Sequence, residues 1–450
     1  MVSMRYFMEP TLDLRPDASP QDTTRTLQAA IDKAGGNPVV IPPGTWTAST
    51  LELRRGATLR LARGAVLRAA SDLSLYPRLP TGHNKDRQPF HFIFARGAEG
   101  ITIEGDGTID GDGPAHWLPP EPPSPWWRAK PARISPLIEI ADCRDVVLRD
   151  FGIRNSPGWT VHVNRCDRVA IRGITLINSL YGPNTDGLDI NGCRDVFVSD
   201  CLISCGDDAI ILKATEDARS CERIAVTNCI LESNCAALGL GAETWHGIRD
   251  VSMSNCVVKR ALRMIQLEMW EPGTIENVVF SNISGNNMTD VPLERPIYID
   301  IQQHGRPEPV LGSVRNVLIQ NFAATTRGRI MLTAQDGSTI EDVTLRDVQL
   351  TYPQIEDPHI TVPASRSTQM SNYSPLTRAA RAAFVADNVR RLQVHNLATR
   401  WPDPDPSHPP MHGMFLRNVE QAIIDCPFLS ASREGIQRIF QDNCRIEMRA

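Results

Sequence analysis

The sequence predicts an all-β chain that winds into a right-handed parallel β-helix, with an N-terminal capping helix and long turn insertions. The first observation is a repeat of about 27 residues. Segments beginning at Cys166, Cys193, Cys221, Ile248 and Ile275 follow one another after 27, 28, 27 and 27 residues. Each unit holds two short runs in which apolar and polar residues alternate, a strand pattern too short for a helix. Such a period is typical of a solenoid of stacked coils.

The second observation is that the repeat continues in both directions, with two longer steps. It begins at Cys143 and extends through Val314, Ile340, Val389 and Val419. The steps of 39 residues before Val314 and 49 residues before Val389 indicate insertions in the turns, which often build the walls of a cleft. We expect loop insertions at residues 114–137 and 351–388, within a single β-helix domain over residues 1–450.

The N-terminal segment departs from the repeat. Residues 10–50 are predicted to form a cap over the open end of the solenoid, as repeat proteins require. Within this cap, Asp22 or Thr23 is expected to begin a helix that carries Leu27 and Ile31 on one face.

Composition bounds the function classes. The chain has 47 Lys+Arg and 52 Asp+Glu, a net charge of −5, with 41% hydrophobic residues. These values exclude a disordered, collagen-like or coiled-coil chain and give no electrostatic reason to expect nucleic acid as a partner. No apolar run is long enough for a membrane span, so no membrane partner is expected. The first ten residues do not resemble a secretory signal, so we expect a cytoplasmic protein, monomeric or weakly oligomeric, unless a leader was removed.

The eleven cysteines fit the repeat. Two groups each share one repeat position: Cys143, Cys166, Cys193 and Cys221, and then Cys201, Cys229 and Cys256. Neighbouring positions of parallel strands suit packed free thiols better than disulfides or a tetrahedral zinc site. Reduced thiols also favour the cytoplasm.

Two acidic stretches stand out on consecutive coils, NTDGLDI (Asn184–Ile190) and CGDDAIILK (Cys205–Lys213). Aligning their apolar strands sets Asp186 beneath Asp208, with Asp207 beside it. Crowded carboxylates repel one another and raise at least one pKa, so one can donate a proton while its ionised neighbours take one from water. Hydrolysis of a glycosidic bond needs this division of roles. The alternatives are that Asp and Gly simply suit turns, or that the cluster binds calcium.

These stretches, together with GTIDGDG (Gly107–Gly113) and LRLARGAVL (Leu59–Leu67), resemble the polygalacturonase family, glycoside hydrolase family 28. The resemblance implies an inverting glycosidase without a metal or other cofactor, acting on a pectic or related oligosaccharide or polysaccharide. It implies that Asp207 is the general acid and that Asp186 and Asp208 activate the attacking water. Asn184 would help to orient this group.

Two departures from the family pattern bear on the substrate. The family's Gly-His-Gly is replaced by a stretch with Ala236 in the place of the His, and CAALGLGAET (Cys235–Thr244) resembles the rhamnogalacturonan-hydrolysing branch. The family's Arg-Ile-Lys clamp for the galacturonate carboxylate is also changed. Strand alternation puts Met264 and Gln266 there, whereas a shift of one residue keeps Arg263 but still loses the Lys. A neutral sugar, or a uronate in another orientation, is therefore expected at the cleavage site.

Further candidates follow from their position near the acidic stretches. Lys213 and Glu268 share an outward column and could simply pair across coils. His246 could replace the missing family His or be an exposed turn residue, and the tryptophans of residues 114–137 could stack on sugars or anchor their loop. The predicted substrate-binding set is Asn184, Asp189, Lys213, Glu243, Trp245, His246, Arg263, Gln266 and Glu268.

Three function classes remain open at this point. The favoured one is a glycosidase that removes terminal residues, since long turn insertions would block one end of a cleft. The alternatives are a β-helix polysaccharide lyase or epimerase and a non-catalytic glycan-binding β-helix.

Overall fold

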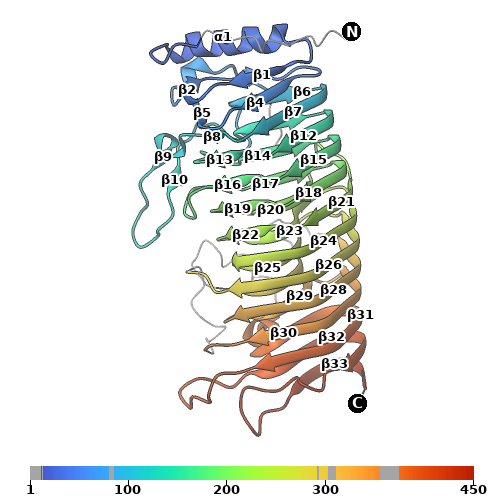
Figure 1. The fold of residues 1–450 in the computed structure, drawn as a ribbon. Helices are drawn as coiled ribbons and strands as arrows, with labels where there is room; N and C mark the ends of the chain where they lie inside the picture. Colours follow the sequence, from blue (N-terminus) through green and yellow to red (C-terminus); the bar gives the residue numbers. More distant parts are fainter. Residues whose placement is uncertain are drawn as a thin grey trace, which may run out of the picture.

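The computed structural model describes residues 12, 14–80, 86–290, 293–302, 311–354 and 374–449. Within these residues the chain forms a right-handed parallel β-helix, whose coils run from the N-terminal end at the top of Figure 1 to the C-terminal end at the bottom. The predicted fold class is confirmed. The extent of a single domain over all 450 residues stays a prediction.

Each coil contributes strands to three parallel stacks, which we call the first, second and third stack in chain order. The first stack contains β3 (Leu51–Glu52), β6 (Ile93–Arg96), β11 (Ile138–Ala141), β14 (Val161–Asn164), β17 (Leu188–Asn191), β20 (Ile210–Ala214), β23 (Ala236–Thr244), β25 (Arg263–Met269), β27 (Arg295–Ile301) and β29 (Ile330–Ala334). The second contains β1 (Pro38–Ile41), β4 (Thr58–Leu61), β7 (Glu99–Gly105), β12 (Arg144–Arg149), β15 (Asp167–Arg172), β18 (Arg194–Ser199) and β21 (Cys221–Thr227). The third contains β2 (Gly44–Ala48), β5 (Ala65–Ala69), β8 (Thr108–Asp110), β13 (Gly152–Arg154), β16 (Thr175–Ile177), β19 (Leu202–Cys205) and β22 (Ile230–Ser233).

In the C-terminal half the strands run on through the corners between stacks. The strands that cross the second and third stacks are β24 (Ile248–Arg260), β26 (Thr274–Asn287), β28 (Ser313–Thr326) and β30 (Thr339–Thr351). Those that begin in the first stack and continue into the second are β31 (Ala382–Arg400), β32 (His412–Asp425) and β33 (Ile439–Met448). The register of these strands is the one that the repeat predicts: Ile248 pairs with Ile275, and Ile275 with Val314.

The predicted N-terminal helix is α1 (Pro20–Lys33), which covers the top of the solenoid in Figure 1. It buries Leu27 and Ile31, as expected from their spacing. The predicted first residue of this helix is wrong. Ser19 is the N-cap, and its hydroxyl oxygen accepts a hydrogen bond from the Asp22 N–H. Pro20 at the first helical position fixes a helical φ and moves the start of the helix ahead of Asp22.

The core is a continuous column of inward-facing apolar side chains in which the cysteines form the predicted ladders. Cys143, Cys166 and Cys193 are buried, and the N–H of each of the first two donates to the sulfur of the next cysteine at 3.3 Å. All eleven cysteines are free, so the prediction of packed thiols is confirmed.

The turn between the second and third stacks bends through a left-handed residue on most coils. Asn255, Asn282 and Asn321 have φ between 52° and 55° and occupy equivalent corners. Their amides bond from coil to coil, Asn282 to Asn255 and Asn321 to Asn282, each at 2.9 Å. Asn tolerates this backbone conformation better than β-branched residues do, which explains the repeated polar turn in the sequence.

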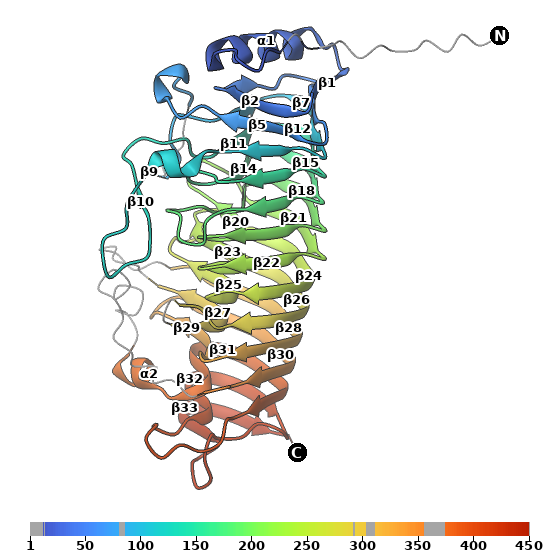
Figure 2. The same cartoon turned by 60° about the vertical axis from the view of Figure 1, so that its left-hand side comes forward.

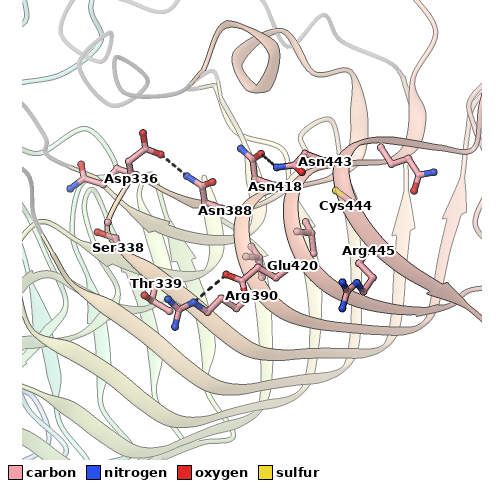
Figure 3. Close-up of a pocket in the computed structure, with 15 residues that line it drawn as sticks. Asp336, Ser338, Thr339, Asn388, Arg390, Asn418, Glu420, Asn443, Cys444 and Arg445 are labelled. Atoms are coloured by element: carbon pink, nitrogen blue, oxygen red, sulfur yellow. Dashed lines mark hydrogen bonds and ion pairs between the residues drawn. The ribbon is translucent and has the colours of Figure 1, made fainter.

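A second ladder lies at the start of the second stack, and the sign of its charge alternates on every coil. Its register partners are, in order, Glu99, Arg144, Asp167, Arg194, Glu222, Arg249, Glu276, Arg315 and Glu341. Arg390, Glu420 and Arg445 continue it beside the paired Val389, Val419 and Cys444. We call this row the charge ladder. Its contacts include Arg249–Glu222 at 2.8 Å and Arg390–Glu420 at 3.5 Å, the latter shown in Figure 3.

The described parts of the two predicted insertions lie along one side of the solenoid (Figure 2). The first contains the 3-10 turn η2 (Gly113–His116) and a small hairpin, β9 (Trp117–Leu118) with β10 (Arg128–Ala129). The second contains the short helix α2 (Pro375–Ala379), and its residues 355–373 lie outside the described part of the chain. A further 3-10 turn, η1, spans Leu73–Leu75. No helix in the described ranges is long and apolar enough to cross a membrane.

Candidate active site

The acid cluster forms where the chain enters two consecutive strands of the first stack. Asp186 precedes β17, and Asp207 and Asp208 precede β20. The pairing of Leu188 with Ile210 sets Asp186 opposite Asp208, and the Gly187 N–H donates to the Asp208 carbonyl at 2.8 Å. The structure therefore brings the three carboxylates together on adjacent coils, as the strand alignment predicts.

Burial differs among these three residues. Asp186 is 3% exposed and Asp208 is 8% exposed, whereas Asp207 is half-buried. Burial raises the pKa of Asp186 well above its ordinary range, and the carboxylates of Asp207, Asp189 and Asp208 raise it further. The Asn184 amide donates to Asp207 Oδ2 at 3.4 Å, a long contact in keeping with its predicted orienting role. The more exposed Asp207 is thus placed to meet a ligand, above a buried Asp186.

The ladder of Asp186 and Asp208 continues into a pair of arginines on the C-terminal side. Ala236 follows Asp208, its N–H donating to Asp208 Oδ1 at 3.1 Å, and Arg263 and Arg295 occupy the next two coils. The prediction that Met264 faces outward at the clamp position is wrong, because Met264 lies in the hydrophobic core. The chain turns into β25 so that Arg263, not Met264, takes the outward place.

The Arg263 guanidinium is already engaged. It donates to Gln266 Oε1 at 2.7 Å, lies 3.2 Å from Glu268 Oε2 and stacks over Tyr298. These residues are buried. Gln266 faces outward, as predicted, and the Arg263 charge is balanced by a carboxylate of the protein.

Lys213 lies on β20, the strand that follows Asp207 and Asp208, with its Nζ over the ring of Trp159. Its Nζ is 3.2 Å from Glu243 Oε2 and 3.9 Å from Asp189 Oδ1. The suggested pairing with Glu268 is not what forms: Glu268 pairs with Arg263, because each residue finds an opposite charge nearer than the other.

Two residues of the predicted substrate-binding set, Trp245 and His246, lie in the turn that follows β23. Trp245 is 39% exposed, and the His246 ring lies 3.3 Å from the Glu216 carbonyl oxygen. The tryptophans of the first insertion differ in burial. Trp117 is buried and its Nε1–H donates to the Pro157 carbonyl, whereas Trp127 is 37% exposed. Trp117 therefore anchors its loop.

A large groove formed by described residues lies elsewhere. It encloses about 970 Å³ on the corner between the first and second stacks, over the last four coils. Asp336, Asn388, Asn418 and Asn443 line one side of it, and Arg390 and Glu420 line the other (Figure 3). None of the predicted site residues belongs to this groove, whose polar ladders already bond to one another.

Comparisons with known proteins give the family of the chain. The family model described as "Glycosyl hydrolases family 28" matches residues 47–368, which is well over half of the chain. The chain belongs to glycosyl hydrolases family 28. A probable polygalacturonase of Vitis vinifera is 31% identical over 261 residues, 52% of this chain and 51% of that protein. An endo-polygalacturonase of Pectobacterium carotovorum subsp. carotovorum is 23% identical over 355 residues, 75% of this chain and 86% of that protein.

This family 28 chain spans 51% to 58% of the length of the first three curated relatives that it matches. Among solved structures, the family 28 exopolygalacturonase of Yersinia enterocolitica matches with a TM-score of 0.70 at 17% identity, covering 92% of this chain and 77% of that one. This likeness supports the β-helix fold.

A metal site in this family 28 chain would need more oxygen ligands than the cluster offers. Asp207, Asp208 and Cys235 each have one potential ligand atom within 4.8 Å of the other two. Calcium takes six to eight oxygens, so two carboxylates and a thiol do not make its coordination shell. The metal-free mechanism stays a prediction.

Sequence reasoning missed two buried residues near the acids of this family 28 chain. His162 lies one coil before Asp189 and Glu139 two coils before it in the same outward column, and both are buried. A signal was present, because the VHVN stretch at residues 161–164 puts a histidine on the face that carries Asp189 one coil later. The partner Arg87 comes from a loop, and no sequence pattern could have placed it there.

Proposed function

We propose that this chain is an inverting glycosidase that removes terminal residues from pectic oligosaccharides, most closely of the rhamnogalacturonan type. The observation that carries the proposal is the acid cluster, in which the buried Asp186 and Asp208 lie beneath a half-exposed Asp207 on adjacent coils. Membership of glycosyl hydrolases family 28 supports a glycosidic bond as the target.

The proposed chemistry divides the work among the three carboxyl groups. Asp207, the most accessible, donates its proton to the leaving oxygen. Asp186 and Asp208 together take a proton from the water that attacks the opposite face of the sugar, which inverts the anomeric configuration. Crowding favours the retention of one proton within the cluster, since three carboxylates so close cannot all ionise readily.

Removal of terminal residues is supported by a wall across the outer face of the first stack on the N-terminal side of the acids. Residues 86–91 and 133–136 cross this face: the Gln88 N–H donates to the Ser135 carbonyl, and Arg87 lies 3.6 Å from Glu139. His162, one coil before the acid cluster, is fully covered. A polymer could not continue along the face past this point.

The identity of the sugar is argued from the cations. A uronate at the cleavage site needs a positive charge that is not already balanced. Arg263 is balanced by Glu268, and the second cation of the family clamp is absent, its column holding Gln266. These contacts support a neutral sugar, or a uronate in a different orientation, on the C-terminal side of the acids.

The test compares the wild type with Asp207→Asn on trigalacturonate, polygalacturonic acid and rhamnogalacturonan oligosaccharides, reading the first-formed anomer by NMR. Asp200→Asn, on an exposed turn, is the matched control. We expect inverted product from chain ends of rhamnogalacturonan oligosaccharides, a loss of at least 1,000-fold in Asp207→Asn by comparison with the ~10²–10⁴-fold of acid catalysis, and no change in the control. An unsaturated product would indicate a lyase instead, and efficient random cleavage of polygalacturonic acid would overturn both the exo action and the argument from the cations.

The compartment and the assembly state are also proposals. Eleven free and mostly buried thiols support a cytoplasmic location, where thiols stay reduced. We propose a monomer or weak oligomer whose partner is the oligosaccharide itself.

A further inference from the structure

A column of buried ionisable residues lies on the outward face of the first stack, on the N-terminal side of the acid cluster. Glu139, His162 and Asp189 are register partners on β11, β14 and β17. Each is at most 2% exposed. Strands one coil apart are about 4.8 Å from each other, so His162 has Glu139 on one side and Asp189 on the other. We call these three residues the buried column.

Glu139 determines which nitrogen of His162 carries a proton. His162 Nδ1 lies 2.6 Å from Glu139 Oε2, and Arg87 lies 3.6 Å from the other Glu139 oxygen. Burial works to raise the pKa of Glu139, but His162, His91 and Arg87 outweigh it and bring the value to about 2. Glu139 is therefore an acceptor, and Nδ1–H donates to it.

The other nitrogen of His162 is left without a partner. Burial lowers the pKa of His162, which favours the neutral ring. With Nδ1 protonated, Nε2 of a neutral ring can only accept a hydrogen bond. It is shielded from solvent and has no partner in the described part of the chain. A shielded acceptor of this kind needs a donor close by.

Asp189 lacks hydrogen-bond partners for its carboxyl group within the described ranges. Both of its carboxyl oxygens are shielded and without a hydrogen-bond partner among the described residues. Lys213, the nearest cation given by the contacts, is 3.9 Å from Oδ1, beyond hydrogen-bond distance, and itself lies closer to Glu243. Burial raises the pKa of Asp189 well above its ordinary range; Lys213 opposes this, and the carboxylates of Asp208, Glu243 and Asp207 reinforce it.

We propose that Asp189 is held in its protonated form and that its O–H turns toward His162 Nε2, the acceptor one coil away to which it makes no hydrogen bond in this structure. The buried column then acts as a set of positioning residues for the acid cluster. This inference rests on the proposed function. An ionised Asp189 would add a third negative charge beside Asp186 and Asp208, which must be ionised to activate water. When Asp189 is neutral, only Asp186 and Asp208 are negatively charged, and the catalytic proton stays on Asp207.

The charged and titratable groups that face this pair are consistent with one shared proton. Around His162 they are Glu139, Arg87, His91 and Lys213. Around Asp189 they are Lys213, Asp186, Asp207, Asp208 and Glu243. The side of Asp189 toward the cluster is dominated by carboxylates, and a proton on Asp189 relieves their repulsion.

The first test needs no substrate, so it stands whether or not a sugar is cleaved. The infrared C=O stretch of protonated carboxyl groups is recorded at pH 7 for the wild type and Asp189→Asn. We expect the wild type to show a protonated-carboxyl band that the variant lacks. Equal bands in both proteins would show that Asp189 is ionised and would overturn the inference, even if the protein proves to be a glycosidase.

The second test separates positioning from a merely structural role by the pH profile of kcat/KM on the best substrate of the panel. His162→Phe removes the acceptor, so Asp189 should ionise and move the acidic limb about one pH unit upward, a loss of about tenfold on that side. Asp189→Asn, which fixes the neutral form, should keep the limb at its wild-type pH, and the double variant should return it there. His395→Phe, on the outward side of β31, is the control.

His162→Gln keeps an acceptor oxygen and covers the case in which His162→Phe does not fold. We expect its acidic limb to stay at the wild-type pH. A limb that moves equally in the Gln and Phe variants, or that Asp189→Asn fails to restore, would refute the role of the buried column.

Discussion

Replacing Asp186 with Asn should abolish activity and yet stabilise the protein. Asp186 Oδ1 is shielded and has no hydrogen-bond partner among the described residues, and three other carboxyl groups surround the side chain. A buried polar atom left unpaired costs about 1–3 kcal/mol. An uncharged amide of the same shape also removes the repulsion, so we expect the free energy of unfolding at pH 8 to rise by about 1–3 kcal/mol.

The stabilisation expected for Asp186→Asn depends on pH. The unfolded chain titrates Asp186 near its ordinary pKa of about 3.9, whereas burial and the neighbouring carboxylates raise the folded pKa well above that. Between the two values the folded state binds more protons, so wild-type stability falls as the pH rises. The gain from Asp186→Asn should therefore be small at pH 4 and complete once the pH exceeds the folded pKa.

Asp110 provides a matched control with the opposite sign. It is buried as deeply, but there burial is outweighed by the Asp112 N–H, Asn155 and Arg154, which lower its pKa. Its contribution is present above the ordinary pKa and is lost as the pH falls, so Asp110→Asn should destabilise by about 1.5–3 kcal/mol at pH 8 and less near pH 3. Urea denaturation of both variants at pH 4 and 8 checks the pair. A destabilised Asp186→Asn at pH 8, or a gain that does not change with pH, would refute the reasoning.

Two further predictions concern charged residues described above. Glu276→Lys puts a third cation between Arg249 and Arg315 of the charge ladder. We expect the free energy of unfolding in urea to fall by about 1 kcal/mol, and by less in 1 M NaCl, because salt screens exposed charges. A fall that salt does not change would contradict the electrostatic cause. Lys213→Met removes the cation that lies 3.2 Å from the Glu243 carboxylate, so we expect a loss of about 3–5 kcal/mol in urea denaturation that Lys213→Arg largely restores; an equal loss in both variants would point to packing instead.

The fold could be predicted because every coil repeats the same physical requirement. A stacked strand needs an inward apolar side chain at alternate positions, and this requirement leaves a period that is visible without any structure. The same register placed Asp186 opposite Asp208, since both stand at a fixed distance before an apolar strand. Where residues are positioned by the repeat, as for the cysteine ladders, the sequence prediction matched the structure.

The errors occur where the chain leaves the repeat. Met264 was assigned outward by strict alternation, but the turn before β25 shifts the alternation by one residue, and Met264 enters the core. Pairings on the surface of the first stack also depend on side-chain reach across coils. Lys213 meets Glu243 rather than Glu268, which spacing alone does not specify. Contacts from loops, such as Arg87 with Glu139, have no pattern in the sequence at all.

The charge ladder has a consequence for how this solenoid can grow or shrink. An exposed contact of the row, such as Arg390–Glu420, is worth no more than about 1 kcal/mol, and Glu222 is buried between its two arginines. The signs of the charges nevertheless alternate along the whole row. Removing or duplicating a single coil would place equal charges against each other at the junction, as Glu222 against Glu276 if the coil of Arg249 were lost. Removing two coils would preserve every opposite-sign neighbour. Insertion or deletion of an even number of coils therefore keeps opposite charges next to each other along the charge ladder. A strand that pairs one coil out of register during folding would instead place its charged residue against a residue of the same charge.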